Sequence, residues 1–168
     1  AVEHIVEERE NGGAFRDLAD FASRVNPRFL NRRAFENLAA AGAFDCLEPN
    51  RAAVVKGAEA ILGLAASNAE QRERGQNDLF ALEASAPAAA PRLPAEDPWL
   101  PMERLKREFE AVGFFLSGHP LDEYLPALKA RQIKTWGEFQ QALAEGQTAA
   151  RLAGTVIYRQ ERSAKSGN

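Results

Sequence analysis

Two groups of residues have the types and spacing needed to bind phosphate. Guanidinium groups donate several hydrogen bonds from a planar fork, which suits phosphate oxygens. Asn50 is a preferred helix N-cap, and Arg51 follows it where backbone N–H groups attract an anion. The other group consists of Arg24, Arg28, Arg32 and Arg33, which lie within ten residues that contain no acid. The alternative interpretation is that these arginines form a basic face that is exposed only to solvent.

Groups suited to catalysis are not evident. Phosphoryl transfer with metal ions needs paired carboxylates. Asp17 and Asp20 occur in a helical stretch, and Asp45 occupies a turn that capping explains. His4 and His119 have no cysteine or second histidine at ligand spacing. We therefore predict no catalytic residue, no metal site and no cofactor in this chain.

An adjacent apolar pair, Leu79 and Phe80, precedes a segment that should not form a core. Residues 84–101 contain five of the nine prolines. Proline removes backbone donors and restricts its neighbours, so this segment should be an extended linker. The pair therefore either folds back onto its own domain or fills an apolar pocket on another protein.

Helical spacing of apolar residues predicts the elements that position these groups. The helix that begins at Asn31 and ends at Gly42, and the one that begins at Asn50, should form a helix-hairpin-helix in which Gly42 and Ala43 turn the chain. Phe44 should fill the core beneath this turn. The further expected elements are helices over 2–11, 15–25, 102–116, 121–130 and 135–146 and one strand over Leu152–Tyr158.

The fold class is expected to be mainly α with four parts. Residues 1–66 form the helix-hairpin-helix module, and 67–101 form an Ala/Pro linker that carries Leu79 and Phe80. Residues 102–147 form a helical connector, and 148–168 begin a truncated β domain. A lone strand has no partner for its hydrogen bonds, so we expect the chain to be a piece of a longer polypeptide.

Bulk composition narrows the class of protein. The apolar content of 45% and charged content of 27% are ordinary for globular proteins. The net charge of −3 disfavours a uniformly basic nucleic-acid binder, so any contact with DNA must be local. One cysteine allows no internal disulfide, and no apolar run approaches the roughly 20 residues of a membrane span. We therefore expect a cytoplasmic protein.

Several stretches resemble one family in the same order and at similar spacing. They are "GGAFRDLADFASRV", "NRRAFENLAAAGAFDCLEPNRAAVV", "GQNDLF" and "VGFFLSGHPLDEY". Together they resemble the alpha subunits of bacterial DNA polymerase III, the replicative polymerases of family C. The closing "LAGTVIYRQERSAKSGN" resembles the first strand and turn of the OB domain in those proteins. The resemblance covers nearly the whole chain.

The resemblance implies two binding functions. The hairpin would hold the backbone of duplex DNA without reading its sequence, through Arg32, Arg33, Gly42, Ala43, Asn50 and Arg51. The second segment would bind the β sliding clamp, with Leu79 and Phe80 in an apolar pocket and the Gln76 amide at its rim. The clamp-binding residues implied in this way are Gln76, Asn77, Asp78, Leu79 and Phe80.

The resemblance also implies which functional parts lie outside this chain. Its catalytic acids and their Mg²⁺ ions belong to a palm domain N-terminal to this region, so the parent would be a DNA-directed DNA polymerase while this segment carries no active site. The implied partners are the rest of the alpha subunit, the holoenzyme, the clamp and DNA, at the nucleoid and without a membrane. Three alternatives stay open: a purely structural connector between polymerase domains, an error-prone paralogue, which the intact "QNDLF" disfavours, and a nuclease or repair enzyme, which is disfavoured because no catalytic acids accompany the hairpin.

Overall fold

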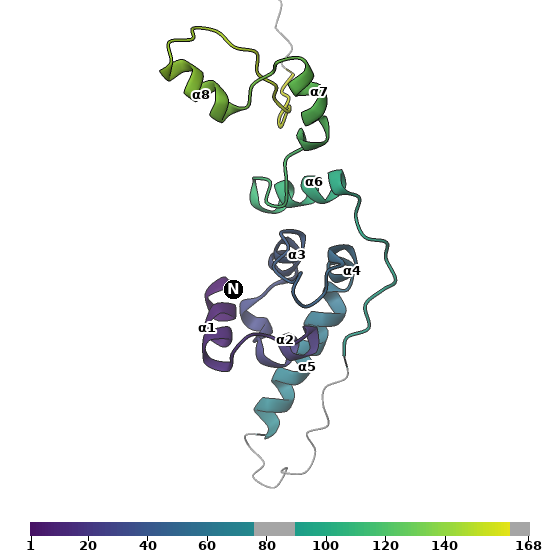
Figure 1. The fold of residues 1–168 in the computed structure, drawn as a ribbon. Helices are drawn as coiled ribbons and strands as arrows, with labels where there is room; N and C mark the ends of the chain where they lie inside the picture. Colours follow the sequence, from purple (N-terminus) through teal and green to yellow (C-terminus); the bar gives the residue numbers. More distant parts are fainter. Residues whose placement is uncertain (76–89, 162–168) are drawn as a thin grey trace, which may run out of the picture. The chain divides into compact units, whose positions relative to one another are not determined.

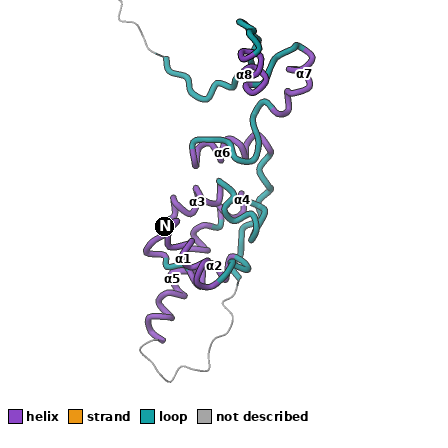
Figure 2. The backbone as a smooth tube through the Cα atoms, turned by 60° about the vertical axis from the view of Figure 1, so that its left-hand side comes forward, coloured by secondary structure: helices purple, strands orange, loops and turns teal. Residues whose placement is uncertain are grey.

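The described residues of the chain are helical, with connecting segments and no strand among them. The computed structural model describes residues 1–75 and 90–161 (Figure 1). They divide into two compact units, Ala1–Ser117 and Gly118–Asn168. Coloured by secondary structure, the same residues show helices joined by loops (Figure 2).

Among its described residues, the first unit contains six α-helices and a short 3₁₀ turn. Asp17, Asn26, Asn31 and Asn50 cap the starts of four of these elements by accepting a backbone N–H of the first turn, which satisfies a donor that has no partner within the helix. The elements are α1 (Val2–Gly12), α2 (Leu18–Arg24), η1 (Pro27–Phe29), α3 (Arg32–Ala40), α4 (Arg51–Lys56), α5 (Ala58–Gly75) and α6 (Pro101–Val112).

The core of the first unit lies where α2, α3 and the hairpin meet α5. Helix α2 and the residue after it present an apolar stripe at helical spacing, and α2 packs along α5. The rings of Phe21, Phe35 and Phe44 contact one another, with Phe35 and Phe44 stacked at 4.8 Å between centroids. Phe44 is buried, which confirms its predicted place in the core.

Three boundaries differ from the sequence-based expectation. The helix expected to begin at Asn50 and to end with the module at residue 66 is two helices that meet at Gly57, and the second continues to Gly75. Helix α6 ends at Gly113, which adopts the left-handed conformation (φ 84°), so residues 114–116 are not helical. Helix α6 also packs against α3 and belongs to the first unit, so residue 102 does not begin a separate part.

The described residues of the second unit form η2 (Asp122–Tyr124), α7 (Leu125–Ala130), α8 (Trp136–Ala144) and an extended segment. Thr135 and Glu138 form a capping box at the start of α8. The strand expected over Leu152–Tyr158 is not formed, because the described residues place no second strand beside it to take up its backbone hydrogen bonds. Its apolar side chains are consequently exposed, as at Val156 and Tyr158.

Candidate nucleic-acid interface

The hairpin between α3 and α4 is organised around Arg51. This side chain is only 9% exposed. Its Nε and Nη2 donate to the two carboxylate oxygens of Asp45, each at 2.7 Å, and its Nη1 donates to the carbonyl oxygen of Ala40 at 3.1 Å. Arg51 therefore fastens the turn to both of its flanking helices.

The lack of a side chain at Gly42 allows the Arg51 side chain to cross the hairpin. Its backbone has φ 89°, a conformation that residues with a side chain adopt at a cost. A Cβ built at Gly42 would lie far inside contact distance of the Arg51 guanidinium. The glycine that marks the hairpin in the sequence is thus explained by the passage of an arginine side chain over it.

Glu108 of α6 is a further hydrogen-bond acceptor for Arg51. Its side chain is 0% exposed, and its Oε1 accepts from Arg51 Nη1 at 2.7 Å. Its Oε2 accepts the backbone N–H groups of Leu116 and Ser117, each at 2.9 Å. One carboxylate therefore joins the hairpin, α6 and the loop that follows α6.

The pKa values reflect this network. Burial by itself raises the pKa of Glu108, but hydrogen bonds from Ser117, Leu116 and Arg51 outweigh burial and lower the pKa to about 2. Hydrogen bonding to Asp45 raises the pKa of Arg51, which burial opposes. Both groups are accordingly charged across the physiological range.

The start of α4 is surrounded by acceptors. Asn50 caps the helix by accepting from Ala53 N at 3.2 Å. Its backbone N–H donates to Glu48 Oε1 at 2.9 Å, and its Nδ2 donates to the carbonyl oxygen of Glu96 at 2.7 Å. The cap predicted from the sequence is confirmed, but its surroundings disfavour an anion.

The expected orientation of Arg51 is therefore corrected. We expected Arg51 to point outward with a free fork, whereas its donors are engaged by Asp45, Ala40 and Glu108. The physical reason is that a buried guanidinium must have its charge and its donors satisfied within the protein. The sequence does carry one sign of this arrangement, since Glu108 interrupts the apolar spacing of Leu105, Phe109 and Val112.

The arginines at the start of α3 are placed differently. Arg32 and Arg33 are both exposed. Arg32 pairs with Glu36 at 2.7 Å and with Glu59 at 3.3 Å. Gly42 is half-buried and Ala43 exposed on the turn.

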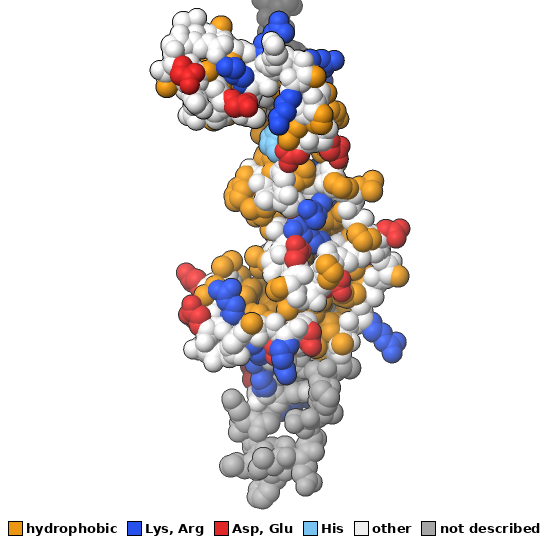
Figure 3. Space-filling view, viewed as in Figure 1, with side chains coloured by type: hydrophobic (Ala, Val, Ile, Leu, Met, Phe, Trp, Pro, Cys, Tyr) orange, Lys and Arg blue, Asp and Glu red, His pale blue; other side chains and the backbone are white. Residues whose placement is uncertain are grey.

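The other two arginines of the basic cluster act within the unit. Arg24 donates to the carbonyl oxygens of Glu8 and Gly13 and lies over the Phe15 ring, so it holds α1 against α2. Arg28 pairs with Glu73 at 3.1 Å. On the face shown in Figure 3, basic and acidic side chains of the described residues are interspersed rather than gathered into a continuous basic stripe.

The predicted clamp-binding residues Gln76, Asn77, Asp78, Leu79 and Phe80 lie outside the described residues. Helix α5 runs up to the residue that precedes them. The chain is described again from Ala90 onward, where Leu93 packs against the core of the first unit.

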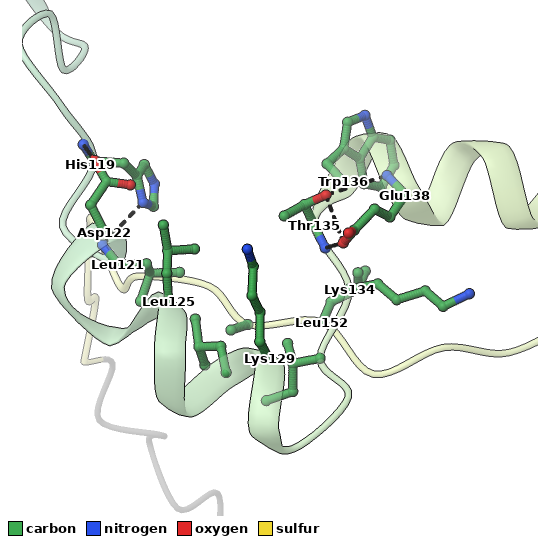
Figure 4. A pocket seen from close by; sticks show the side chains of 13 residues that line it. His119, Leu121, Asp122, Leu125, Lys129, Lys134, Thr135, Trp136, Glu138 and Leu152 are labelled. Atoms are coloured by element: carbon green, nitrogen blue, oxygen red, sulfur yellow. Dashed lines mark hydrogen bonds between the residues drawn. The ribbon is translucent and has the colours of Figure 1, made fainter.

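The second unit contains a pocket of about 350 Å³ with a mainly apolar lining (Figure 4). Leu121, Leu125, Trp136 and Leu152 contribute to its wall. Several of its polar groups form hydrogen bonds within local turns. Asp122 accepts from the His119 N–H at 2.7 Å, His119 Nδ1 accepts from the Leu121 N–H at 3.1 Å, and Glu138 accepts from the Thr135 N–H at 2.7 Å.

The described part of the chain contains neither a cluster of metal ligands nor a membrane-spanning helix. Within residues 1–75 and 90–161 no three histidine, cysteine, aspartate or glutamate side chains gather as a metal would require. In the same ranges no helix has the length and apolar character needed to cross a membrane.

Comparisons with known proteins identify relatives of this chain. A family model described as a helix-hairpin-helix motif matches residues 1–54. The chain is 41% identical over 167 residues to the DNA polymerase III subunit alpha of Caulobacter vibrioides, covering 99% of this chain and 14% of that protein. Proteins of the same name from Vibrio cholerae and Escherichia coli K12 are 38% and 37% identical over 76% of this chain, which spans 11% of their length.

The resemblance noted in the sequence is thereby confirmed at the level of the family. The matched region includes the whole hairpin with Gly42, Asp45 and Asn50, and the relatives extend well beyond what this chain spans. Over most of its length, this chain is homologous to one short segment of bacterial DNA polymerase III alpha subunits.

Proposed function

We propose that this chain is a non-catalytic region of a replicative DNA polymerase, which holds duplex DNA by its backbone and tethers the polymerase to the β sliding clamp. The observation that carries the proposal is homology to polymerase III alpha subunits over nearly the whole chain. In this proposal the nucleotidyl transfer, with its Mg²⁺ ions, belongs to other parts of the parent polymerase, which works in the cytoplasm at the nucleoid.

The DNA contact is proposed for the exposed start of α3 and the turn. Arg32 and Arg33 offer exposed guanidinium groups to phosphates at the start of α3, where a phosphate would replace the surface pairs of Arg32 with Glu36 and Glu59. The backbone at Gly42 and Ala43 lies on the turn that follows the other end of α3. Arg51 is not part of this surface, because its side chain is buried and its donors are engaged within the protein. Binding of this kind is independent of base sequence and falls as salt rises.

The tether is proposed for Gln76–Phe80. A glutamine followed three and four residues later by Leu79 and Phe80 offers one amide and two large apolar groups to a pocket. Burying both apolar side chains is favourable, while ordering the peptide opposes binding, so the affinity is about micromolar. Such a contact suffices because linked sites meet at about millimolar effective concentration.

A second candidate function is a structural connector without affinity for DNA. The observation that favours it is the engagement of Arg51 by Asp45 and Glu108, together with Glu48 and Glu96 around the start of α4. The same hairpin then serves to pack α6 onto α3. Salt-dependent binding of duplex DNA separates the two functions.

The decisive experiment is a calorimetric titration of this chain against the β sliding clamp of Caulobacter vibrioides. We expect micromolar binding by the wild type and its loss in the double variant Leu79→Ala/Phe80→Ala. Leu82→Ala is the matched control, because it shortens a neighbouring leucine outside the motif and should leave binding unchanged. Absence of binding by the wild type would overturn the tether.

A further inference from the structure

Helix α1 is held on the first unit by few contacts. It lies at the edge of the unit and contains no buried residue (Figure 1). Ile5 packs against the hydrophobic core as a partly buried residue. Arg24 of α2 donates to the carbonyl oxygen of Glu8. A helix that buries so little apolar surface can detach by local unfolding while the rest of the unit stays folded.

A further contact of α1 comes from His4. Its ring is half-buried, and its Nε2 accepts the backbone N–H of Asn26 at 2.9 Å. Among the residues that the structure describes, His4 is the only acceptor for this N–H. The His4 ring also contacts the Phe29 ring, with 4.9 Å between the centroids. The imidazole therefore joins α1 to the corner between α2 and η1.

The direction of this hydrogen bond defines the protonation state of His4. A neutral imidazole has one N–H group and one acceptor nitrogen, whereas an imidazolium has two N–H groups. Because Nε2 accepts, the ring is neutral and carries its proton on Nδ1. A proton on Nε2 would place two donors against each other. It would also leave the half-buried N–H of Asn26 without an acceptor, which is unfavourable.

The charged groups near His4 do not replace the lost acceptor. These groups are Glu3, Glu7, Glu8, Arg9 and Glu10 on α1, Asp20 and Arg24 on α2, and Arg28 on η1. The two groups on α2 pair with each other, and Arg28 pairs with Glu73 of α5 at 3.1 Å. A protonated ring would be attracted to the carboxylates three and four positions later on its own helix, and not toward Asn26.

We propose that His4 is a pH-sensitive contact, which holds α1 on the first unit while the imidazole is neutral and releases α1 when the imidazole is protonated. Histidine is the side chain whose charge ordinarily changes between about pH 5 and 8. Only the neutral ring accepts, so the contact stabilises the docked helix at the upper end of this range and is lost as pH falls. Neither DNA nor the clamp takes part, so failure of this contact leaves the proposed function intact.

Hydrogen exchange of the α1 amides in this chain tests the contact, once the intrinsic pH dependence of exchange is divided out. In the wild type we expect protection of α1 to fall at least tenfold between about pH 7.5 and about pH 5.5, while protection of α2 and α5 changes less than threefold. His4→Gln keeps an acceptor oxygen at about the reach of Nε2 but does not titrate. Protection of α1 in this variant should change less than threefold over the same range.

Two further variants separate the roles of the ring. His4→Phe keeps an aromatic ring against Phe29 without an acceptor, so its α1 should have the protection of the acidified wild type at both pH values. His119→Gln is the matched control, because His119 Nδ1 accepts from the Leu121 N–H within its own turn. It should leave the exchange of α1 as in the wild type. Unchanged protection in the wild type, or the same pH dependence in His4→Gln, would overturn the proposal.

The tautomer of His4 provides a readout that does not require α1 to detach. The ¹⁵N chemical shifts of the neutral ring, measured at about pH 7.5, should place the proton on Nδ1. The amide proton of Asn26 should change its chemical shift as the ring titrates, and it should not do so in His4→Gln. A neutral ring with its proton on Nε2 would contradict the hydrogen bond from Asn26 and the proposal with it.

Discussion

Arg51 Nη1 donates to Glu108 Oε1 at 2.7 Å, across a separation of 57 residues in the sequence. The first residue begins α4, and the second lies on α6, after the proline-rich segment. Glu108 also accepts hydrogen bonds from two backbone N–H groups of the loop after α6. The Arg51–Glu108 pair therefore holds α6 and this loop against the hairpin.

Truncating Arg51 should destabilise the first unit. Arg51→Ala leaves the Glu108 carboxylate buried without its cation, and breaking a buried pair in this way costs about 3–5 kcal/mol of unfolding free energy. Urea unfolding followed by circular dichroism measures the loss. Arg33→Ala, at an exposed arginine, should change stability by less than about 0.5 kcal/mol. A loss below about 1 kcal/mol for Arg51→Ala contradicts the network.

Acid should remove the contribution of Glu108. Its pKa of about 2 lies below the value of 4.5 for an unperturbed glutamate, so its stabilisation is complete above pH 4.5 and is lost as pH falls toward 2. We expect the wild type to lose about 3 kcal/mol relative to Glu108→Gln across that window. Unfolding free energies of both proteins at pH 7, 4 and 3 test this, and a constant difference between them would refute it.

Gly42→Ala should cost more than its backbone conformation explains. Gly42 and Gly113 both have positive φ, at 89° and 84°. A Cβ at Gly113 meets nothing within 4 Å, so Gly113→Ala isolates the backbone cost of about 1–2 kcal/mol. Gly42→Ala should cost about 1–3 kcal/mol more, because the Arg51 guanidinium must move. Equal thermal shifts for the two variants would mean that Arg51 relocates without penalty.

Removing Arg32 and Arg33 should weaken binding of duplex DNA equally on all sequences. For each phosphate that the protein no longer neutralises, the slope of log K against log salt becomes shallower by about 0.9. Arg104→Ala is the control, because Arg104 is an exposed arginine on α6 and is not among the residues proposed to contact DNA. Fluorescence anisotropy across a salt series measures both affinity and slope. An unchanged slope in Arg32→Ala/Arg33→Ala would favour the structural connector.

Features that depend on neighbours in the chain were predictable from the sequence. The caps at Asn31 and Asn50 are present, because an N-cap needs only its own side chain and the next turn. Phe44 is in the core, since an aromatic residue in a tight turn between two amphipathic helices has one apolar place to go. The family was also recognisable, because several stretches matched in order.

Features that depend on residues far apart in the sequence were not predictable from the sequence. Leu93 packs beside Gly57, and Glu108 of α6 pairs with Arg51, so both contacts join residues that are far apart in the sequence. The prediction of a strand over Leu152–Tyr158 was wrong, because a strand forms only beside a partner that takes up its backbone hydrogen bonds.

The sequence by itself determined the helices, their caps and the kinship of this chain, because those depend on local spacing and on residue order. Only the tertiary structure decided what Arg51 does. A guanidinium can face a phosphate or a buried carboxylate with the same donors, and the outcome depends on which acceptor the fold brings to it. Here α6 brings Glu108, and the side chain that looked like a ligand for DNA holds the hairpin together.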